Sequence, residues 1–196
     1  PRVTMVGHGG VGKSTTAEAL TRAAGADCSD LADGHYVSTR GMALLNWPLP
    51  GQPPLRVRLW DLAGQLEYYA THALLMNGAL VLYLLAVSLT GVTRPQGDGH
   101  GAEGDVEVSL REQLALWLRF MRLLSGAEFS GQHRRSMLVV VGTHVDQLAN
   151  ASTAAAVGSP VVDAAELGLR RLDRELRALP EELRGERILF DADLSR

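Results

Sequence analysis

The stretch GHGGVGKSTT, residues 7–16, constrains this 196-residue chain more than any other feature. A short apolar run precedes it and a segment of helical character follows it, so a strand, a glycine-rich turn and a helix are expected in succession. The spacing of Gly7, Gly12, Lys13 and Ser14 is that of a P-loop, which binds phosphate groups. A glycine-rich turn that fits this spacing by chance is the alternative, and the flanking strand and helix disfavour it.

The residue types of this loop suit a nucleotide phosphate. Glycines let successive backbone N–H groups point inward around phosphate oxygens, where a Cβ would obstruct them. Lys13 is expected to reach the β- and γ-phosphates, the Ser14 hydroxyl to bind Mg²⁺, and the following helix to add the positive end of its dipole. The expected phosphate-binding residues are Gly7, His8, Gly9, Gly10, Val11, Gly12, Lys13, Ser14 and Thr15.

Composition limits the class of protein. The length suits one domain, and 46% hydrophobic residues with only 5% aromatics predict an aliphatic core. A net charge of −3 without a basic run argues against nucleic-acid binding. The apolar stretch 79–87 is too short to enter and cross a membrane. One cysteine excludes an internal disulfide and favours a cytoplasmic location. Because the sequence opens inside an expected strand, without a signal peptide, we interpret residues 1–196 as a single domain cut from a larger multidomain protein.

Alternating elements predict an α/β fold. Strands are expected at 3–6, 42–49, 55–61, 79–87, 137–146 (ending in a polar loop) and 187–193. Helices are expected at 13–24, 110–124 and 162–179, and 65–77 is expected to be a loop that runs into a helix. Such alternation predicts a mostly parallel sheet of about six strands flanked by helices, with ligands bound at the carboxyl ends of the strands. The glycine-rich and acidic segment 90–107 is expected to be a flexible insertion. Trp117, on the apolar stripe of its helix, is expected to pack in the core.

Two further motifs follow strands and indicate which nucleotide binds. In WDLAGQ, residues 60–65, Asp61 is expected to hold Mg²⁺ through water, the Gly64 N–H to contact the γ-phosphate, and Gln65 to orient an attacking water. In the polar loop that ends 137–146, Asp146 can accept hydrogen bonds from guanine N1–H and the 2-amino group. Adenine would leave that carboxylate unpaired, so guanine is favoured. The alternative is that Asp146 only caps the next segment.

Together these motifs resemble the Roc domain, the Ras-like GTPase module of Roco proteins. The resemblance covers nearly the whole chain. It rests on GHGGVGKS, on Thr-x-Gly at 39–41 eight residues before Trp47, on WDLAGQLEYYATH at 60–72 and on VGTHVD at 141–146. The Thr-His-x-Asp form of the last motif, where small GTPases usually carry Asn-Lys-x-Asp, makes the resemblance Roc-like and not only Ras-like. The family includes leucine-rich-repeat kinases and death-associated protein kinase, and the LALWLRFM helix with the long insertion before it looks closer to the latter.

The resemblance implies a Ras-like P-loop GTPase fold that binds GDP or GTP with Mg²⁺. It makes Thr39 a switch I ligand of Mg²⁺ and γ-phosphate, and Gln65, Lys13 and Thr39 the catalytic residues. It assigns guanine to Thr143, His144, Asp146 and the backbone N–H of Ala192, and Mg²⁺ to Ser14, Thr39 and Asp61. It also implies neighbouring COR, kinase or repeat domains, allows a homodimer, and suggests that the last helix of the fold is lacking.

Two alternatives stay open at this point. One is a MinD- or ParA-like ATPase, although His8 stands where the signature lysine of that class would be. The other is a nucleotide-holding interaction or dimerisation module with negligible hydrolysis. Thr143 replaces an asparagine that usually ties the base loop to the P-loop, so we expect loosely held nucleotide and fast exchange. With only Arg40 as a nearby cationic candidate, slow hydrolysis is expected.

Overall fold

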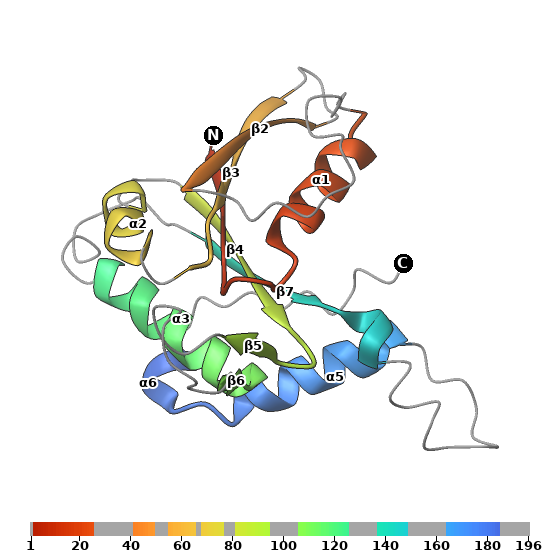
Figure 1. Ribbon diagram of the computed structural model, residues 1–196, viewed down its shortest axis with the longest axis vertical. Helices are drawn as coiled ribbons and strands as arrows, with labels where there is room; N and C mark the ends of the chain where they lie inside the picture. The colour runs from red at the N-terminus through yellow and green to blue at the C-terminus, as the bar shows by residue number, and fades with distance from the viewer. Residues whose placement is uncertain are drawn as a thin grey trace, which may run out of the picture.

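The computed structural model describes residues 2–25, 41–49, 55–65, 68–76, 81–94, 106–125, 137–148 and 164–184. Its main sheet has five strands in the order β2-β3-β1-β4-β7 (Figure 1). The strands are β1 (Arg2–Val6), β2 (Met42–Leu49), β3 (Leu55–Leu62), β4 (Val81–Ser88) and β7 (Met137–Thr143). Only the β2–β3 pairing is antiparallel, whereas β3–β1, β1–β4 and β4–β7 are parallel. The expected mostly parallel sheet is therefore confirmed, and the sixth expected strand, 187–193, lies outside the described residues.

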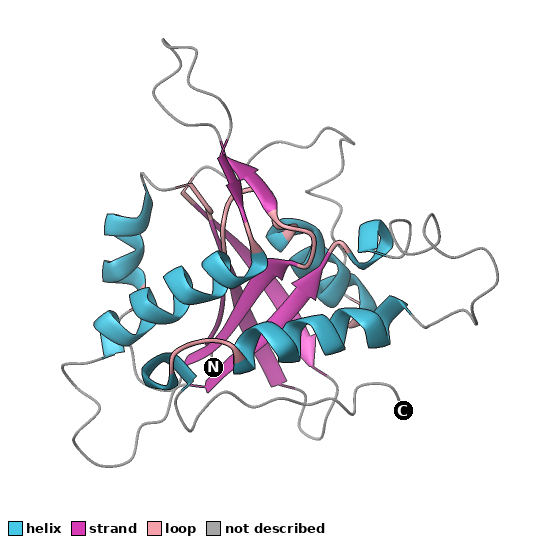
Figure 2. Ribbon diagram, turned by 90° about the horizontal axis from the view of Figure 1, so that it is seen from below, coloured by secondary structure: helices cyan, strands magenta, loops and turns pink. Residues whose placement is uncertain are grey.

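Helices cover both faces of this sheet (Figure 2). They are α1 (Lys13–Ala23), α2 (Tyr69–Leu75), α3 (Leu110–Ser125), α5 (Ala164–Arg177) and the short α6 (Glu181–Arg184). On one face α1 packs against β1, β3 and β4, and on the other face α3 and α5 share a core with β4 (Figure 1). No helix in the described residues is long and apolar enough to cross a membrane.

Burial explains why these segments become strands. Seven of the eight β4 residues are buried, as a continuously apolar central strand with helices on both faces should be. In β3, the exposed Arg56 and Arg58 alternate with the buried Val57 and Leu59, in agreement with the period of two in the sequence. The sheet thereby brings the carboxyl ends of β1, β3, β4 and β7 to one edge.

The apolar stripe of α3 is confirmed as a core face. Leu110, Leu114 and Trp117 are at most 3% exposed. The helix begins with a capping box, because the Ser109 N–H donates to Glu112 Oε2 at 2.8 Å and the Glu112 N–H donates to Ser109 Oγ at 3.3 Å. The Ser109 hydroxyl also donates to Glu112 Oε2 at 2.7 Å, and this bond, followed by the one from the Ser109 N–H, lowers the pKa of the Glu112 carboxyl.

The ends of the segment 90–107 differ from the flexible insertion that was expected. Strands β5 (Val92–Arg94) and β6 (Val106–Val108) pair in an antiparallel ribbon at the start of α3. Their polar, glycine-flanked sequence hid this pairing, which needs only three residues on each side. The buried Gln113 fixes the ribbon, since its amide accepts from the Ser88 N–H at 2.9 Å and donates to Val108 O at 3.3 Å. Residues 95–105 lie outside the described residues.

Candidate functional site

The loop between β1 and α1 has a backbone that requires glycine. Gly7 has φ +144°, and a Cβ there would lie 2.3 Å from the Ala86 carbonyl oxygen of β4. Gly12, the N-cap of α1, has φ +81° in the left-handed region. Of the other predicted phosphate-binding residues, Val11 is buried, while Gly9, Gly10 and Thr15 are exposed. The loop thus leaves part of its surface open at the N-terminus of a helix, where an anion is favoured.

Lys13 lies folded against this loop. Its side chain is 7% exposed, and its ammonium donates to the His8 carbonyl oxygen at 2.8 Å. Burial lowers the pKa of Lys13 to about 8, and the nearby Asp61 carboxylate opposes that shift. A cation that the protein alone solvates poorly is well placed to gain from a bound phosphate.

The two described residues predicted to hold Mg²⁺ meet in the structure. The Ser14 hydroxyl donates to Asp61 Oδ2 at 2.5 Å, although 47 positions separate them in the chain. Ser14 is in the first turn of α1, and Asp61 lies near the carboxyl end of β3 and is 2% exposed. The described residues form no cluster of three or more metal-ligating side chains. A hydroxyl and a carboxylate nevertheless fit Mg²⁺, which takes few protein oxygens and completes its shell with phosphates and water. Thr39 lies outside the described residues.

The DLAGQ segment, residues 61–65, lies directly on residues 7–12, the loop predicted to bind phosphate and called the phosphate-binding loop below. The Gly9 N–H donates to the Gly64 carbonyl oxygen at 2.9 Å. A Cβ on Gly64 would lie 2.3 Å from Gly9 N, so no other residue allows this approach. Gln65 follows, half-buried, and its carbonyl accepts from the Tyr68 N–H at 3.2 Å at the start of α2.

The loop expected to bind the base, which begins at Thr143, is hydrogen-bonded to the phosphate-binding loop. Thr143 Oγ1, at the end of β7, lies 2.7 Å from Val11 O and 3.0 Å from Val87 O. The premise that the loops lose their connection without an asparagine was wrong, because the Thr143 hydroxyl reaches the Val11 carbonyl. The expected fast exchange of nucleotide stays a prediction. His144 follows with φ 59° and its Nδ1 3.3 Å from Thr143 Oγ1.

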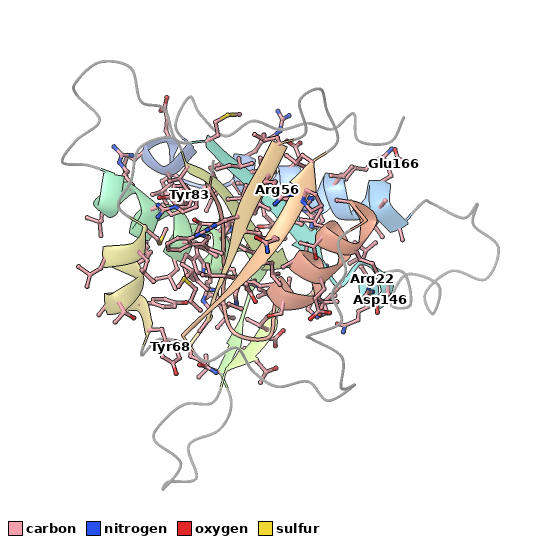
Figure 3. All side chains as sticks on the ribbon, turned by 90° about the horizontal axis from the view of Figure 1, so that it is seen from above. Arg22, Arg56, Tyr68, Tyr83, Asp146 and Glu166 are labelled. Carbon is pink, nitrogen blue, oxygen red and sulfur yellow. The ribbon has the colours of Figure 1, made fainter. Side chains whose placement is uncertain are left out.

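Asp146 projects from the helical turn that begins at 145. Its side chain is exposed, and it makes no hydrogen bond or ion pair with another residue in the described part of the chain. Figure 3 places it at the edge of the molecule in that view, on the turn that follows β7. It therefore caps nothing that the structure describes, and its carboxylate is accessible to a ligand. Ala192, the other predicted guanine contact, lies outside the described residues.

Sequence reasoning missed one residue of this site. Trp117 packs in the core as predicted, but its indole N–H also donates to His8 Nδ1 at 3.0 Å. The two residues are 109 positions apart, and no motif connects a helix tryptophan with a loop histidine. Only the three-dimensional fold reveals the contact.

Comparison with known proteins yields a distant similarity. No protein-family model matches the chain. Over 117 residues, or 58% of the chain, it is 28% identical to a probable serine/threonine-protein kinase, roco5, of Dictyostelium discoideum. The chain spans about 3% of the length of that relative. The similarity thus relates one domain-sized segment to a Roco protein.

Proposed function

We propose that this chain is a Roc-type, Ras-like GTPase domain. It binds GDP and GTP with Mg²⁺, hydrolyses GTP slowly, and switches the neighbouring domains of a larger Roco protein, which are of COR, kinase or repeat type. The similarity to a Roco kinase and the mixed α/β fold with its P-loop sequence support this assignment.

The observation that carries the proposal is the meeting of Lys13, Ser14 and Asp61. An ammonium and a hydroxyl from the first turn of α1 meet a carboxylate from the end of β3 beside a glycine-rich loop. Phosphoryl transfer needs this set, since it depends on positioning and on neutralising charge on the phosphate oxygens. When bound, Mg²⁺ would supply further positive charge at the phosphates, held by Ser14 and Asp61.

The remaining residues have roles that follow from their positions. The N–H groups of the loop and the Lys13 ammonium would bind the phosphates. A γ-phosphate would compete with the Gly64 carbonyl for the Gly9 N–H, so GTP and GDP would place the 61–65 segment differently. Gln65, which moves with that segment, would orient the attacking water.

The ATPase alternative finds less support in the site. His8 takes the position of the signature lysine of MinD- and ParA-like proteins, and its ring is buried against Trp117 of α3. It therefore faces the protein core. A bound base would cover the exposed Asp146 carboxylate; guanine would then pair with it, whereas adenine would leave it desolvated and unpaired, which favours guanine further.

A base-exchange experiment tests the assignment. Purified protein should bind labelled GDP and GTP and should not bind ATP. Asp146→Asn should weaken GDP binding and raise affinity for xanthosine diphosphate, because the amide can pair with the 2-oxo group of xanthine. A direct competition of both diphosphates against the wild type and the variant measures the change. An Asp146→Asn protein with unchanged preference for GDP would contradict the base assignment.

A further inference from the structure

A single histidine connects the phosphate-binding loop with α3. His8 is 4% exposed, and its ring meets the Trp117 ring edge-on, with centroids 6.2 Å apart. The indole Nε1–H can only donate, so His8 Nδ1 is the acceptor of the 3.0 Å bond and a neutral ring carries its proton on Nε2. Because both partners are buried, this bond defines one orientation of the histidine.

The backbone around His8 makes the two contacts that matter most at the site. Its own carbonyl accepts from the Lys13 ammonium, and the next N–H, of Gly9, donates to Gly64. A displacement of the His8 ring is therefore transmitted to the phosphate-binding lysine and to the DLAGQ segment. Neither contact involves a side chain of the loop other than that of Lys13.

Trp117 also reaches the helix that follows DLAGQ. Its ring packs on Tyr69, the first residue of α2, with centroids 4.9 Å apart, and Phe120 closes the cluster at 5.7 Å from Trp117. Tyr69 lies four positions after Gln65. A rigid indole thus contacts both the phosphate-binding loop and the start of α2.

We propose that His8 and Trp117 are a positioning pair that makes the phosphate-binding loop and α2 respond to each other. The inference rests on the proposed function. Binding of a diphosphate engages the loop alone, whereas a γ-phosphate also displaces Gly64 from Gly9 and thereby shifts α2 against Trp117. The pair stabilises the arrangement in which the Gly9 N–H bonds the Gly64 carbonyl, and therefore opposes the γ-phosphate-dependent arrangement without touching the nucleotide.

The first test needs no nucleotide. In Trp117→Phe the aromatic packing on Tyr69 is kept and the N–H donor is lost. We expect amide exchange at Gly9 to accelerate by roughly tenfold, as for the loss of one net hydrogen bond. Phe120→Leu, which alters the same aromatic cluster without touching His8, is the matched control and should leave Gly9 exchange unchanged. Equally accelerated Gly9 exchange in both variants would mean that the His8–Trp117 bond has no effect beyond that of aromatic packing, and would overturn the proposal.

The second test measures the preference for a GTP analogue over GDP. Trp117→Phe should raise this preference by roughly tenfold, because the Gly9–Gly64 contact that a γ-phosphate displaces is weakened, with GDP affinity changed less than about threefold. The double variant His8→Leu/Trp117→Phe should change this preference no more than Trp117→Phe alone, because both substitutions remove the same bond. A parallel loss for both nucleotides would show a merely structural role. If the wild type binds neither guanine nucleotide, the proposed function fails, while Gly9 exchange still decides whether the pair positions the loop.

Discussion

At the scale of single residues, the most consequential feature is a lysine whose charge the protein disfavours. Burial lowers the pKa of Lys13 from 10.5 to about 8. Between these values the unfolded chain binds more protons than the folded one, so this group makes the folded protein more stable as pH rises from about 8 to about 10.5. A bound phosphate would reverse the effect by favouring the charged ammonium.

Nucleotide binding should therefore take up protons near pH 8. There Lys13 is about half protonated in the free protein, so binding of GDP should take up about half a proton as its pKa rises. Calorimetric titrations in two buffers with different ionisation enthalpies measure this uptake. At pH 7 it should fall to about a tenth of a proton. Equal uptake at both pH values would mean that another group titrates.

Thr143 should slow the release of nucleotide. Thr143→Val keeps the shape of the side chain but leaves the Val11 and Val87 carbonyls without their hydroxyl partner. We expect GDP release about tenfold faster and a loss of about 1–2 kcal/mol in the free energy of unfolding. Thr143→Ser retains the hydroxyl and should stay close to wild type in stopped-flow release of fluorescent GDP. A serine variant as fast as the valine variant would assign the effect to the methyl group.

At the scale of elements, the sequence was most informative where a single segment contains its own signal. The apolar run of β4, the stripe of α3 and the glycines of the phosphate loop each satisfy a local requirement, and all were predicted. The tie from Thr143 to Val11 and the bond from Trp117 to His8 join residues more than a hundred positions apart. The spacing of residues within a single sequence does not indicate which distant residues will contact each other in the fold. The β5–β6 ribbon was not predicted, because its strands of three residues each are too short to show a periodic pattern.

The junction of β1 with the phosphate loop should depend strictly on Gly7. Gly7→Ala places a Cβ 2.3 Å from Ala86 O of β4, so we expect a loss of more than about 3 kcal/mol in the free energy of unfolding. Gly10→Ala is the matched control: Gly10 also has a positive φ, of +76°, but nothing lies within 4 Å of its Cβ position. There only backbone strain of about 1 kcal/mol is expected. If urea unfolding showed equal losses of stability for Gly7→Ala and Gly10→Ala, then backbone strain, and not the contact with β4, would account for the effect at Gly7.

At the scale of the whole molecule, the phosphate-binding loop lies between two hydrophobic clusters on opposite faces of the sheet. The loop runs directly into α1, which packs in the smaller cluster. Through His8 and Gly64 it contacts the layer that contains α2 and α3. A ligand on this loop thus touches both layers, an arrangement that suits a switch.

As a whole the domain should turn over slowly. Gln65 is placed beside the loop, but Arg40, the predicted cationic partner, lies outside the described residues. Unassisted GTPases of the Ras type turn over at about 10⁻⁴ s⁻¹, so we expect well below about one turnover per minute. Gln65→Leu should lower the single-turnover rate further and leave GDP affinity intact, as phosphate-release kinetics would show. Fast multiple turnover by the isolated chain would contradict the switch. A rate equal in wild type and Gln65→Leu would favour the alternative of a nucleotide-holding interaction module.

The β5–β6 ribbon has a consequence for how such a domain can diversify. Arg94 and Val106 pair directly across the two strands, so the chain leaves and re-enters the domain at neighbouring points. Closing a longer loop between fixed ends costs only about 0.6 kcal/mol for each doubling of its length. Selection can therefore lengthen, shorten or replace the intervening residues while the proposed nucleotide site stays intact. The same position is suited to a genetically inserted reporter.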